Sequence, residues 1–369
     1  MADNNPIATP EHKIGSEYTG KKVRIGIVGA GNISETHLHS YKEVPQVEVV
    51  AICDIDENRV KMTADSFGIE KRYLSIEEMI AAEELDAVDV CVWNCNHAKC
   101  AIYALEHGLN VICEKPMATT VAECEAMKAA AEKSGKVLMM AFVRVFTNET
   151  DIVEEYKEEL GDIYYAKMSV CRRHGAPGGW FCDSARSGGG PVIDLAVHVL
   201  SQIYFNLGRV KPVSVYAMTN KAIGNRPNLK NKVTYTPYPS KFDNGVIDTE
   251  DFGVALVRFE NGAVIEVEAS YDMHMEPEGS FDIYGTKGGI RMADGKNPVL
   301  YTDIKDRMVN MEIVRPAQVR KPFVEELTHF ADCVLNGTPC KTTADDGINI
   351  TKILTAIYES AKTQHEVIL

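Results

Sequence analysis

The sequence predicts two domains: a doubly wound α/β domain with a parallel sheet, then an α+β domain with a large, mainly antiparallel open sheet. Short apolar strands alternate with helix-length segments over residues 21–143, which is typical of parallel strands joined by right-handed crossovers. Longer strands with period-two alternation follow over residues 144–369. The length of 369 residues also suits two domains, since one domain takes roughly 150 residues.

The first domain contains five runs of apolar and β-branched residues of strand length. They lie at 22–28, 47–53, 86–92, 110–113 and 136–141. The segment 121–133 is rich in Ala, Glu, Lys and Met, which favour helix. Residues 1–20 are polar and lack an apolar stretch after a basic start, so we expect a flexible arm and not a signal peptide.

The second domain begins with a predicted helix and continues with alternating strands. The helix is at 151–160, the strands are at 164–172, 212–218, 251–259, 263–271 and 279–284, and closing helices are at 325–335 and 347–363. Ile265, Val267 and Ala269 alternate with polar residues, which predicts one buried and one wetter face. The dipeptide Asn261-Gly262 predicts a hairpin turn, and 220–244 is interpreted as an irregular loop of unknown role.

The charge balance excludes two classes of partner. The net charge is −14 at pH 7, so the surface repels phosphate backbones and anionic lipids. No apolar run approaches the ~18 residues that cross a bilayer. We therefore expect a cytoplasmic protein that binds neither nucleic acid nor membrane.

The cysteines indicate reduced thiols and not a metal site. Ten cysteines in 369 residues are too few for a disulfide scaffold. Cys91, Cys95, His97 and Cys100 have the ligand types of zinc, but their spacing departs from the usual paired signatures. We expect core thiols and no metal.

A glycine-rich turn follows the first predicted strand. Gly29-Ala30-Gly31-Asn32-Ile33-Ser34 has the form G-x-G-x-x-S and opens a helix. Gly29 permits a tight turn and Gly31 lets the backbone approach a pyrophosphate at the helix N-terminus. We expect Gly29, Gly31, Asn32 and Ile33 to contact a dinucleotide in a Rossmann domain.

An acidic residue ends the second strand and indicates which dinucleotide binds. Asp54 lies 25 positions after Gly29, where a carboxylate accepts hydrogen bonds from the adenosine ribose. Asp56 and Glu57 follow it closely. A 2′-phosphate would be repelled by about 1 kcal/mol or more per carboxylate, so NAD is the expected cofactor and not NADP.

A lysine lies just past the fourth of these strands. In Glu114-Lys115-Pro116, the proline restricts Lys115 to extended backbone. Open α/β sheets bind ligands at the edge where their strands end. A surface ion pair would be the usual interpretation of such a dipeptide, but its position relative to the glycine turn favours a role at the cofactor.

The glycine turn, Asp54 and Glu114-Lys115-Pro116 together resemble the glucose–fructose oxidoreductase, inositol dehydrogenase and MocA family, clearly over about residues 22–207. These are NAD(P)-dependent sugar and cyclitol oxidoreductases. The resemblance implies NAD bound also by Glu114 and Lys115, a small sugar, cyclitol or glycoside as substrate, and a homo-oligomer formed through the open face of the second sheet. The alternation at Ile265, Val267 and Ala269 is compatible with such a face.

A buried helix supplies the second motif. Gly188-Gly189-Gly190-Pro191 predicts a helix start, and residues 192–207 are apolar almost all round. Asp194 and His198 are four apart and so share a face. Such a pair can simply satisfy itself, but after a glycine run it matches the family's second motif.

By that resemblance, Lys115, Asp194 and His198 surround the nicotinamide and the reacting hydroxyl. A neutral histidine is suited to take a hydroxyl proton near pH 7, so we assign His198 as the base, with Lys115 as the alternative. Asp194 would bind a neighbouring hydroxyl or orient the site. Lys115 would donate to the reacting oxygen.

Further residues match the pattern of the family less closely. Asn94 and His97 match positions at the cofactor, although Trp93 stands where the family usually has proline; His97 lines the cofactor or only begins a helix. We expect four residues near the substrate: Arg144, Arg172, His174 and Trp180. Trp180, beside glycines, suits a wall that stacks on a sugar ring, or else anchors its loop.

These features predict NAD-dependent oxidation of a secondary ring hydroxyl of a hexose or glycoside, because each hydroxyl of such a substrate finds a polar partner. The loop Pro177-Gly178-Gly179-Trp180-Phe181 resembles that of bacterial enzymes that make 3-oxo-glucosides, and this resemblance implies oxidation at C3. An inositol dehydrogenase is the alternative within the class. A glycosidase that oxidises C3 transiently and eliminates the aglycone is a second alternative. A sensor without turnover is disfavoured because Lys115, Asp194 and His198 are all present.

Overall fold

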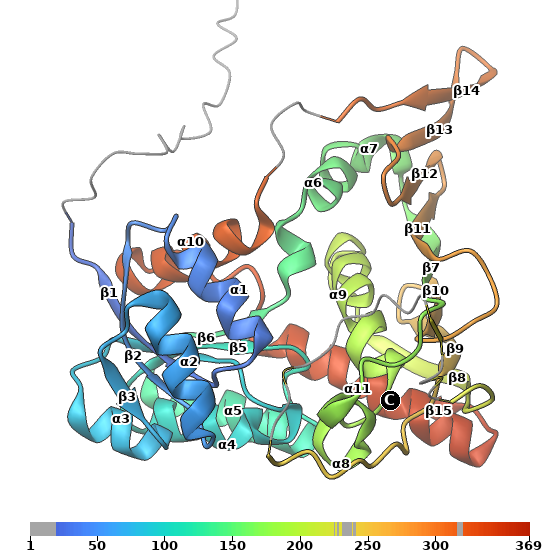
Figure 1. Ribbon diagram of the computed structural model, residues 1–369. Helices are drawn as coiled ribbons and strands as arrows, with labels where there is room; N and C mark the ends of the chain where they lie inside the picture. Colours follow the sequence, from blue (N-terminus) through green and yellow to red (C-terminus); the bar gives the residue numbers. More distant parts are fainter. Residues whose placement is uncertain (1–19, 225, 227–228, 231–237, 239–240, 316–319) are drawn as a thin grey trace, which may run out of the picture.

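The computed structural model describes residues 20–224, 226, 229–230, 238, 241–315 and 320–369. The predicted arm lies outside the described residues except for its last position, as does part of the 220–244 stretch. Two sheets organise the chain, one of six strands and one of nine (Figure 1). The predicted fold class is confirmed: a parallel, doubly wound sheet is followed by a mainly antiparallel one.

The first sheet is parallel throughout and has the order β3-β2-β1-β4-β5-β6. Its strands are β1 (Val23–Val28), β2 (Val47–Cys53), β3 (Lys71–Tyr73), β4 (Ala87–Val90), β5 (Asn110–Glu114) and β6 (Leu138–Ala141). Its helices are α1 (Asn32–Tyr41), α2 (Glu57–Phe67), α3 (Ile76–Ala82), α4 (His97–Glu106) and α5 (Val121–Ser134). The sequence predicted every strand except the short β3.

The strand register brings the predicted cofactor residues to one edge. Val28 is paired with Cys53 on β2 and with Val90 on β4, and Val90 is paired with Cys113 on β5. The residues that follow these positions therefore leave the sheet side by side. The strand order reverses between β1 and β4, and the crevice at such a switch point is where doubly wound sheets bind ligands.

The second sheet has the order β14-β13-β12-β11-β7-β10-β9-β8-β15. Its strands are β7 (Ile163–Cys171), β8 (Pro212–Asn220), β9 (Phe252–Phe259), β10 (Val264–Ser270), β11 (Glu278–Gly285), β12 (Gly288–Ala293), β13 (Val299–Ile304), β14 (Arg307–Glu312) and β15 (Val367–Ile368). Only the β7–β10 pair is parallel. The predicted hairpin between β9 and β10 is present, with Gly262 at φ +84°.

One face of this sheet is covered by the chain's own helices. Ile265, Val267 and Ala269 are at most 1% exposed, and their strand packs against the helical turn Val192–Ala196. On the same side, toward the first sheet, α9 (Val197–Asn206) packs on β7 and α11 (Ala344–Thr363) packs on β8 (Figure 1). The outer face instead exposes apolar side chains such as Tyr216, Met218 and Leu256. The alternation at Ile265, Val267 and Ala269 therefore marks the inner face. Any subunit contact through the open face involves the side chains of the outer face instead.

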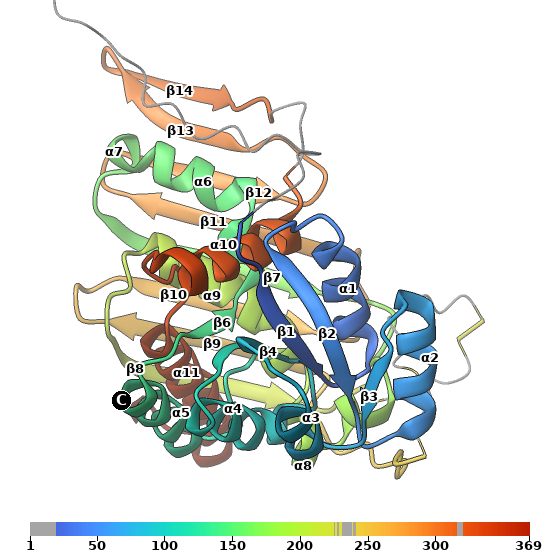
Figure 2. The ribbon, with the colours of Figure 1, turned by 90° about the vertical axis from the view of Figure 1, so that its left-hand side faces the viewer.

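Four further α-helices lie in the part of the chain that the structure describes. They are α6 (Asn148–Glu155), α7 (Lys157–Leu160), α8 (Ser184–Ser187) and α10 (Pro322–Asn336). The predicted helix at 151–160 is thus divided into α6 and α7. Helix α10 packs against α1 and β1, and α11 packs against both α5 and β8 (Figure 2). The domain boundary near residue 143 stays a prediction. No helix in the described ranges combines the length and apolarity needed to span a membrane.

Candidate active site

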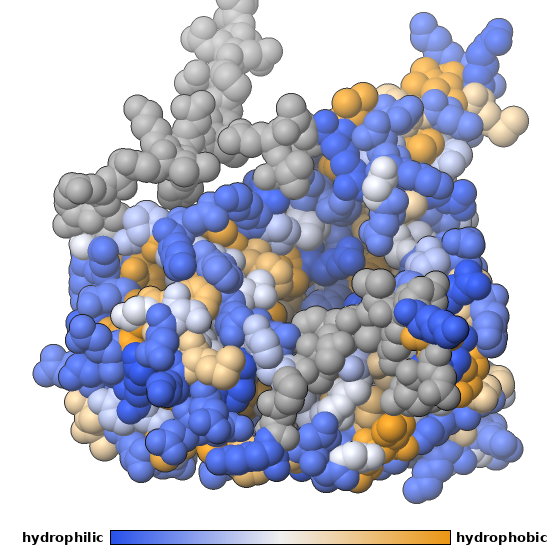
Figure 3. Space-filling view, in the orientation of Figure 1, coloured by the Kyte–Doolittle hydropathy of each residue, from blue (hydrophilic) through white to orange (hydrophobic). Residues whose placement is uncertain are grey.

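A cavity of about 580 Å³ lies at the carboxyl ends of the parallel strands and is shared by the two halves of the chain. The space-filling surface is hollowed between these halves (Figure 3). Most predicted site residues line it: Gly29, Gly31, Asn32, Ile33, Asp54, Asn94, His97, Glu114, Lys115, Arg172, Trp180, Asp194 and His198. Arg144 lines a separate small pocket, and His174 borders neither. Their substrate roles stay predictions.

The glycine turn has the geometry that a pyrophosphate needs. Gly29 has φ +106°, and a Cβ there would lie 2.4 Å from the Cys91 carbonyl oxygen, so no other residue fits. A Cβ on Gly31 would meet nothing within 4 Å, which leaves its backbone accessible. Helix α1 begins without a side-chain cap, and the N–H groups of a first helical turn, which have no acceptor within the helix, favour an anion. Ser34 Oγ donates to Gly31 O at 2.7 Å and closes the turn.

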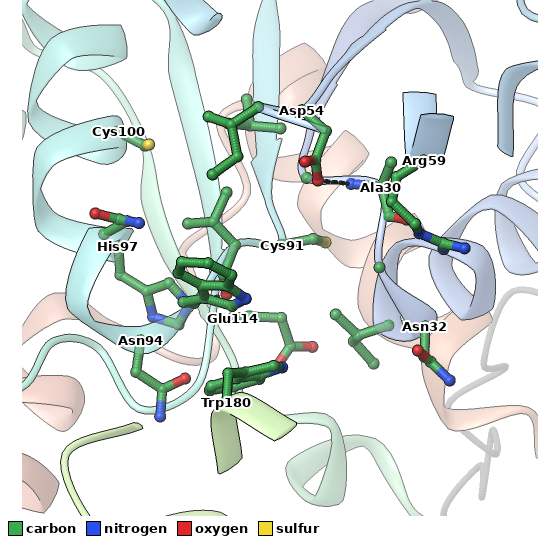
Figure 4. A pocket seen from close by; sticks show the side chains of 18 of the residues that line it. Ala30, Asn32, Asp54, Arg59, Cys91, Asn94, His97, Cys100, Glu114 and Trp180 are labelled. Carbon is green, nitrogen blue, oxygen red and sulfur yellow. Dashed lines mark hydrogen bonds between the residues drawn. The ribbon is translucent and has the colours of Figure 1, made fainter. Parts of the chain in front are cut away.

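Asp54 is tied to the glycine turn. Its Oδ2 accepts a hydrogen bond from Ala30 N at 2.8 Å and its Oδ1 accepts one from Asp56 N at 2.8 Å (Figure 4). Burial raises the pKa of the Asp54 carboxyl, while the two N–H donors oppose that rise. The carboxylate therefore borders the cavity in an orientation fixed by the backbone, and its remaining lone pairs are suited to ribose hydroxyls.

Part of the 220–244 stretch reaches the same turn. Tyr238 N donates to Asn32 Oδ1 at 3.2 Å, and the Tyr238 hydroxyl donates to Glu35 Oε2 at 2.8 Å. The Arg59 guanidinium lies 3.8 Å from the centre of the Tyr238 ring and donates to Ala30 O at 3.0 Å. Arg59 is thus engaged by the chain itself.

Lys115 lines the cavity and joins the two halves of the chain. Its Nζ donates to the main-chain oxygen of Asp194 at 3.0 Å and to Asp194 Oδ1 at 3.1 Å. Both side chains are about one-sixth exposed or less. The peptide between Lys115 and Pro116 is cis. Glu114 Oε2 accepts from Lys115 N at 3.0 Å, so neighbouring groups fix the lysine at both ends.

His97 contacts the backbone at Pro116, directly after Lys115. Its Nδ1 lies 2.7 Å from Pro116 O and its Nε2 lies 3.1 Å from Val92 O. Burial lowers the pKa of His97, so the ring is neutral and donates to only one of these two oxygens. The ring lies between the segments that follow β4 and β5. Asn94 Nδ2 donates to Ser187 O at 2.7 Å and so connects the same wall to the second half of the chain.

Tyr271 is a site residue that the sequence did not indicate. Its hydroxyl donates to Asp194 Oδ2 at 3.0 Å, and the side chain is 1% exposed. Burial and the nearby Asp194 charge raise the pKa of Tyr271, so it stays a donor. The available signal was a tyrosine ending the apolar face of an alternating strand, since a buried tyrosine hydroxyl needs a partner.

His198 and Asp194 both line the cavity, and no hydrogen bond joins their side chains in the part of the chain that the structure describes. Asp194 lies in a π-helical turn, Val192–Ala196. Within the described residues no hydrogen bond reaches the His198 imidazole. Burial and the positive charges of Lys115, Arg144 and Arg172 lower the pKa of His198 well below 6.5. The ring is therefore neutral at pH 7 and has a nitrogen lone pair free to accept a proton.

Behind the cavity lies a buried polar cluster. Asp89 accepts hydrogen bonds from Tyr41 (3.0 Å) and Cys91 (3.2 Å) and lies 2.8 Å from His37 Nδ1. Among the described residues, His37, Asp89 and Cys91 alone bring three possible ligand atoms close together. Burial raises the pKa of the Cys91 thiol, and all three residues already pair with one another. The expectation of no metal stays a prediction.

Comparisons with known proteins identify the family of the chain. Residues 23–142 match the GFO/IDH/MocA oxidoreductase family, NAD-binding Rossmann fold, and residues 156–291 match the GFO/IDH/MocA C-terminal domain. D-glucoside 3-dehydrogenase of Escherichia coli (strain K12) is 28% identical over 94% of this chain and 98% of its own length. Myo-inositol 2-dehydrogenase of Thermotoga maritima is 26% identical over 88% and 92%.

A solved structure gives the same result at the level of the fold. Levoglucosan dehydrogenase in complex with NADH and levoglucosan has a TM-score of 0.80 and 25% identity, over 94% of this chain and 99% of that one. The family matches cover the first sheet and the second sheet from β7 to β11, and the resemblance seen in the motifs is confirmed. The chain belongs to the Gfo/Idh/MocA family and is an NAD-dependent oxidoreductase.

Proposed function

We propose that this enzyme oxidises a secondary ring hydroxyl of a sugar or glycoside, at C3, to the ketone. The observation that carries the proposal is the pairing of Lys115 with Asp194 across the cavity, beside a neutral His198. When bound, NAD supplies the hydride acceptor. The carbinol C–H bond breaks with its electron pair as hydride and the O–H bond loses its proton, so the products are ketone, NADH and H⁺.

The three side chains divide the remaining work. His198 accepts the hydroxyl proton because its ring is neutral and has no competing hydrogen bond among the described residues. Lys115 donates to the reacting oxygen as negative charge grows there. Asp194, held by Tyr271, accepts a hydrogen bond from the neighbouring hydroxyl. Two groups on different elements thus face one oxygen, which is the condition for positioning it.

The surroundings favour a polyhydroxylated ring. Lys115, Arg172, Asp194 and His198 line the cavity, and each offers a partner that an apolar alcohol would leave unpaired. Trp180 also lines the cavity and stacks on Phe181, with the ring centres 4.0 Å apart. Such an aromatic face packs against the C–H face of a sugar. The glucoside 3-dehydrogenase relative supports oxidation at C3.

The inositol dehydrogenase relative supports the alternative of a cyclitol substrate, so the test compares substrates directly. Purified enzyme with NAD is offered D-glucosides, free hexoses and inositols, while NADH and products are both followed. A 3-oxo-glucoside formed with the highest kcat/KM supports the proposal. Faster oxidation of an inositol contradicts the choice of substrate. Aglycone release without net NADH contradicts a simple dehydrogenase and identifies the elimination route.

The cofactor preference is expected to be NAD over NADP by about 30-fold or more in kcat/KM, because two carboxylates repel a 2′-phosphate by about 1 kcal/mol each. Asp54 and Asp56 line the cavity, whereas Glu57 does not. Asp56→Asn keeps the helix cap on Asn58 N and should narrow the preference severalfold. Glu57→Gln is the matched control and should leave it unchanged; equal use of both cofactors by the unmodified enzyme would refute the assignment.

We also propose a homo-oligomer built on the outer face of the second sheet. Tyr216, Met218 and Leu256 on β8 and β9 are each 46–58% exposed, and large exposed side chains of this kind gather at subunit contacts. Light scattering of the purified protein measures the number of chains. A single chain, or an oligomer that Leu256→Lys leaves intact, contradicts the proposed face.

A further inference from the structure

Glu250, which precedes β9, joins three donors from two helices. Its Oε2 accepts from Gly190 N at 2.9 Å, and its Oε1 accepts from Val192 N at 3.3 Å and from the Tyr358 hydroxyl at 2.8 Å. Gly190 and Val192 begin the helical segment that carries Asp194 and His198, and Tyr358 belongs to α11. The carboxylate therefore connects the start of that segment to a helix fixed against both sheets.

Two glycines of the run lie where Glu250 and Tyr358 come closest to the start of the helical segment. A Cβ on Gly190 would lie 2.4 Å from the Glu250 main-chain oxygen, and a Cβ on Gly189 would lie 2.1 Å from the Tyr358 hydroxyl oxygen. Any other residue at either position would displace Glu250 or Tyr358. The sequence pattern predicted only that these glycines begin a helix. The structure shows that the absence of their side chains leaves room for Glu250 and Tyr358, which come from two other parts of the chain.

The helix start needs such a partner. The first N–H groups of a helix have no acceptor within it, and here the first turn is the wider π turn Val192–Ala196. Asp194 lies in the middle of this turn, and its main-chain oxygen as well as its carboxylate accepts from Lys115. A shift of the turn therefore moves both atoms that Lys115 contacts.

The residue after Glu250 holds Asp194 from the other side. Asp251 O accepts hydrogen bonds from Tyr271 N at 2.9 Å and from Ser270 Oγ at 3.0 Å. Tyr271 in turn donates to Asp194 Oδ2. The dipeptide Glu250-Asp251 thus determines the backbone of Asp194 through the helix start and its carboxylate through Tyr271.

We propose that Glu250 is a positioning residue for the oxidation: it fixes the π turn so that Asp194 meets Lys115 in the cavity. Glu250 does not line the cavity and acts through Asp194. The inference rests on the proposed function, because it takes Lys115 and Asp194 as the groups that meet the substrate. Displacements of about 1 Å at such a site cost on the order of 10²-fold in rate.

The test compares three variants of the full-length enzyme. Glu250→Gln places an amide NH₂ where an acceptor is needed, and we expect kcat to fall about 10- to 100-fold. Tyr358→Phe removes one donor and should lower kcat by about 3- to 10-fold. The dissociation constant for NAD, measured by calorimetry, should change by less than about 3-fold in both, because the glycine turn and Asp54 belong to the other half.

Asp346→Asn is the matched control for stability. Asp346 is a buried carboxylate that accepts from Thr343 N at 2.8 Å and from Arg209 Nε at 2.9 Å, and it caps α11 away from the cavity. We expect Asp346→Asn to lower Tm by about as much as Glu250→Gln does, while its kcat stays within about 2-fold of that of the unmodified enzyme. A kcat loss confined to the Glu250 and Tyr358 variants supports positioning.

Two results would overturn the inference. One is a folded Glu250→Gln enzyme with the kcat of the unmodified protein. The other is a kcat loss that follows Tm equally in Asp346→Asn. If Glu250→Gln fails to fold, Tyr358→Phe alone decides, since it removes only a hydroxyl, and an unchanged kcat there counts against positioning. Full activity after loss of Lys115 would instead refute the proposed function, so the two failures are distinguishable.

Discussion

Replacing Lys115 with methionine is expected to lower kcat by about 10³-fold, because a positioned donor to a developing oxyanion contributes on the order of 10²–10³. Lys115 also holds Asp194 through two hydrogen bonds, and methionine, which has similar length, leaves that carboxylate without its cation. The measurement is kcat with NAD at saturating sugar. Lys115→Arg should recover only part of the rate, because a planar guanidinium places its donors differently.

Lys128→Met is a matched control for that substitution. Lys128 also pairs with an aspartate, Asp345, at 2.7 Å, but on the surface of α5 and α11. Exposed pairs of this kind contribute about 0–1 kcal/mol to stability and nothing to the cavity. The Lys128 variant should therefore keep the kcat of the unmodified enzyme. An unchanged kcat in Lys115→Met would show that Lys115 has no role in the proposed mechanism.

Replacing His198 with asparagine is expected to lower kcat by about 10²- to 10⁴-fold, the usual contribution of a general base. The unmodified enzyme supplies a second readout. Burial and the charges of Lys115, Arg144 and Arg172 lower the pKa of His198 well below 6.5. The ring therefore loses its proton at a lower pH than a free histidine, and kcat/KM should fall on the acid side only below pH 6.5.

The direction of that pH effect is itself testable. Arg144→Met removes one of the positive charges that disfavour a protonated His198, so the pKa rises and the acid limb should move to higher pH. In His198→Asn the limb should disappear. If the limb persists in the asparagine variant, another group is the base, and Lys115 is then the first candidate. A limb that does not move in Arg144→Met contradicts the electrostatic account.

The cofactor side of the site could be predicted from sequence because each part of it is local. The glycine turn, Asp54 and Glu114-Lys115-Pro116 each follow directly from one strand, and a parallel sheet brings its strand ends to a common edge. The sheet order converts that chain pattern into proximity. Hydrophobic runs thus located both the strands and the cavity.

The substrate side was less predictable because its contacts join distant segments. Tyr271 is 77 residues from Asp194 and Glu250 is 60 residues from Gly190, and no periodicity links such pairs. The π turn could not be predicted either, because the same residues fit an α-helical pattern. Asp194 and His198 both line the cavity, but the sequence pattern did not indicate the two partners of Asp194, which are Lys115 and Tyr271.

Two further differences concern the second sheet. Alternation showed that β10 has unlike faces but gave no information on which face the chain's own helices cover. Strands β12, β13 and β14 were not predicted, because glycines and charged residues interrupt the alternation there. These strands form the end of the sheet, and the β13–β14 hairpin projects from the body of the molecule (Figures 1 and 2).

The packing of α10 has a consequence for how the protein is made. Leu327, Phe330 and Ala331 are fully buried, and their helix lies against α1 and β1 at the opposite end of the chain. Domains normally fold in order as they leave the ribosome. Here α10 follows β7 to β14 in the chain, so the flank of the first sheet that α10 covers stays exposed until those strands of the second sheet have been synthesised.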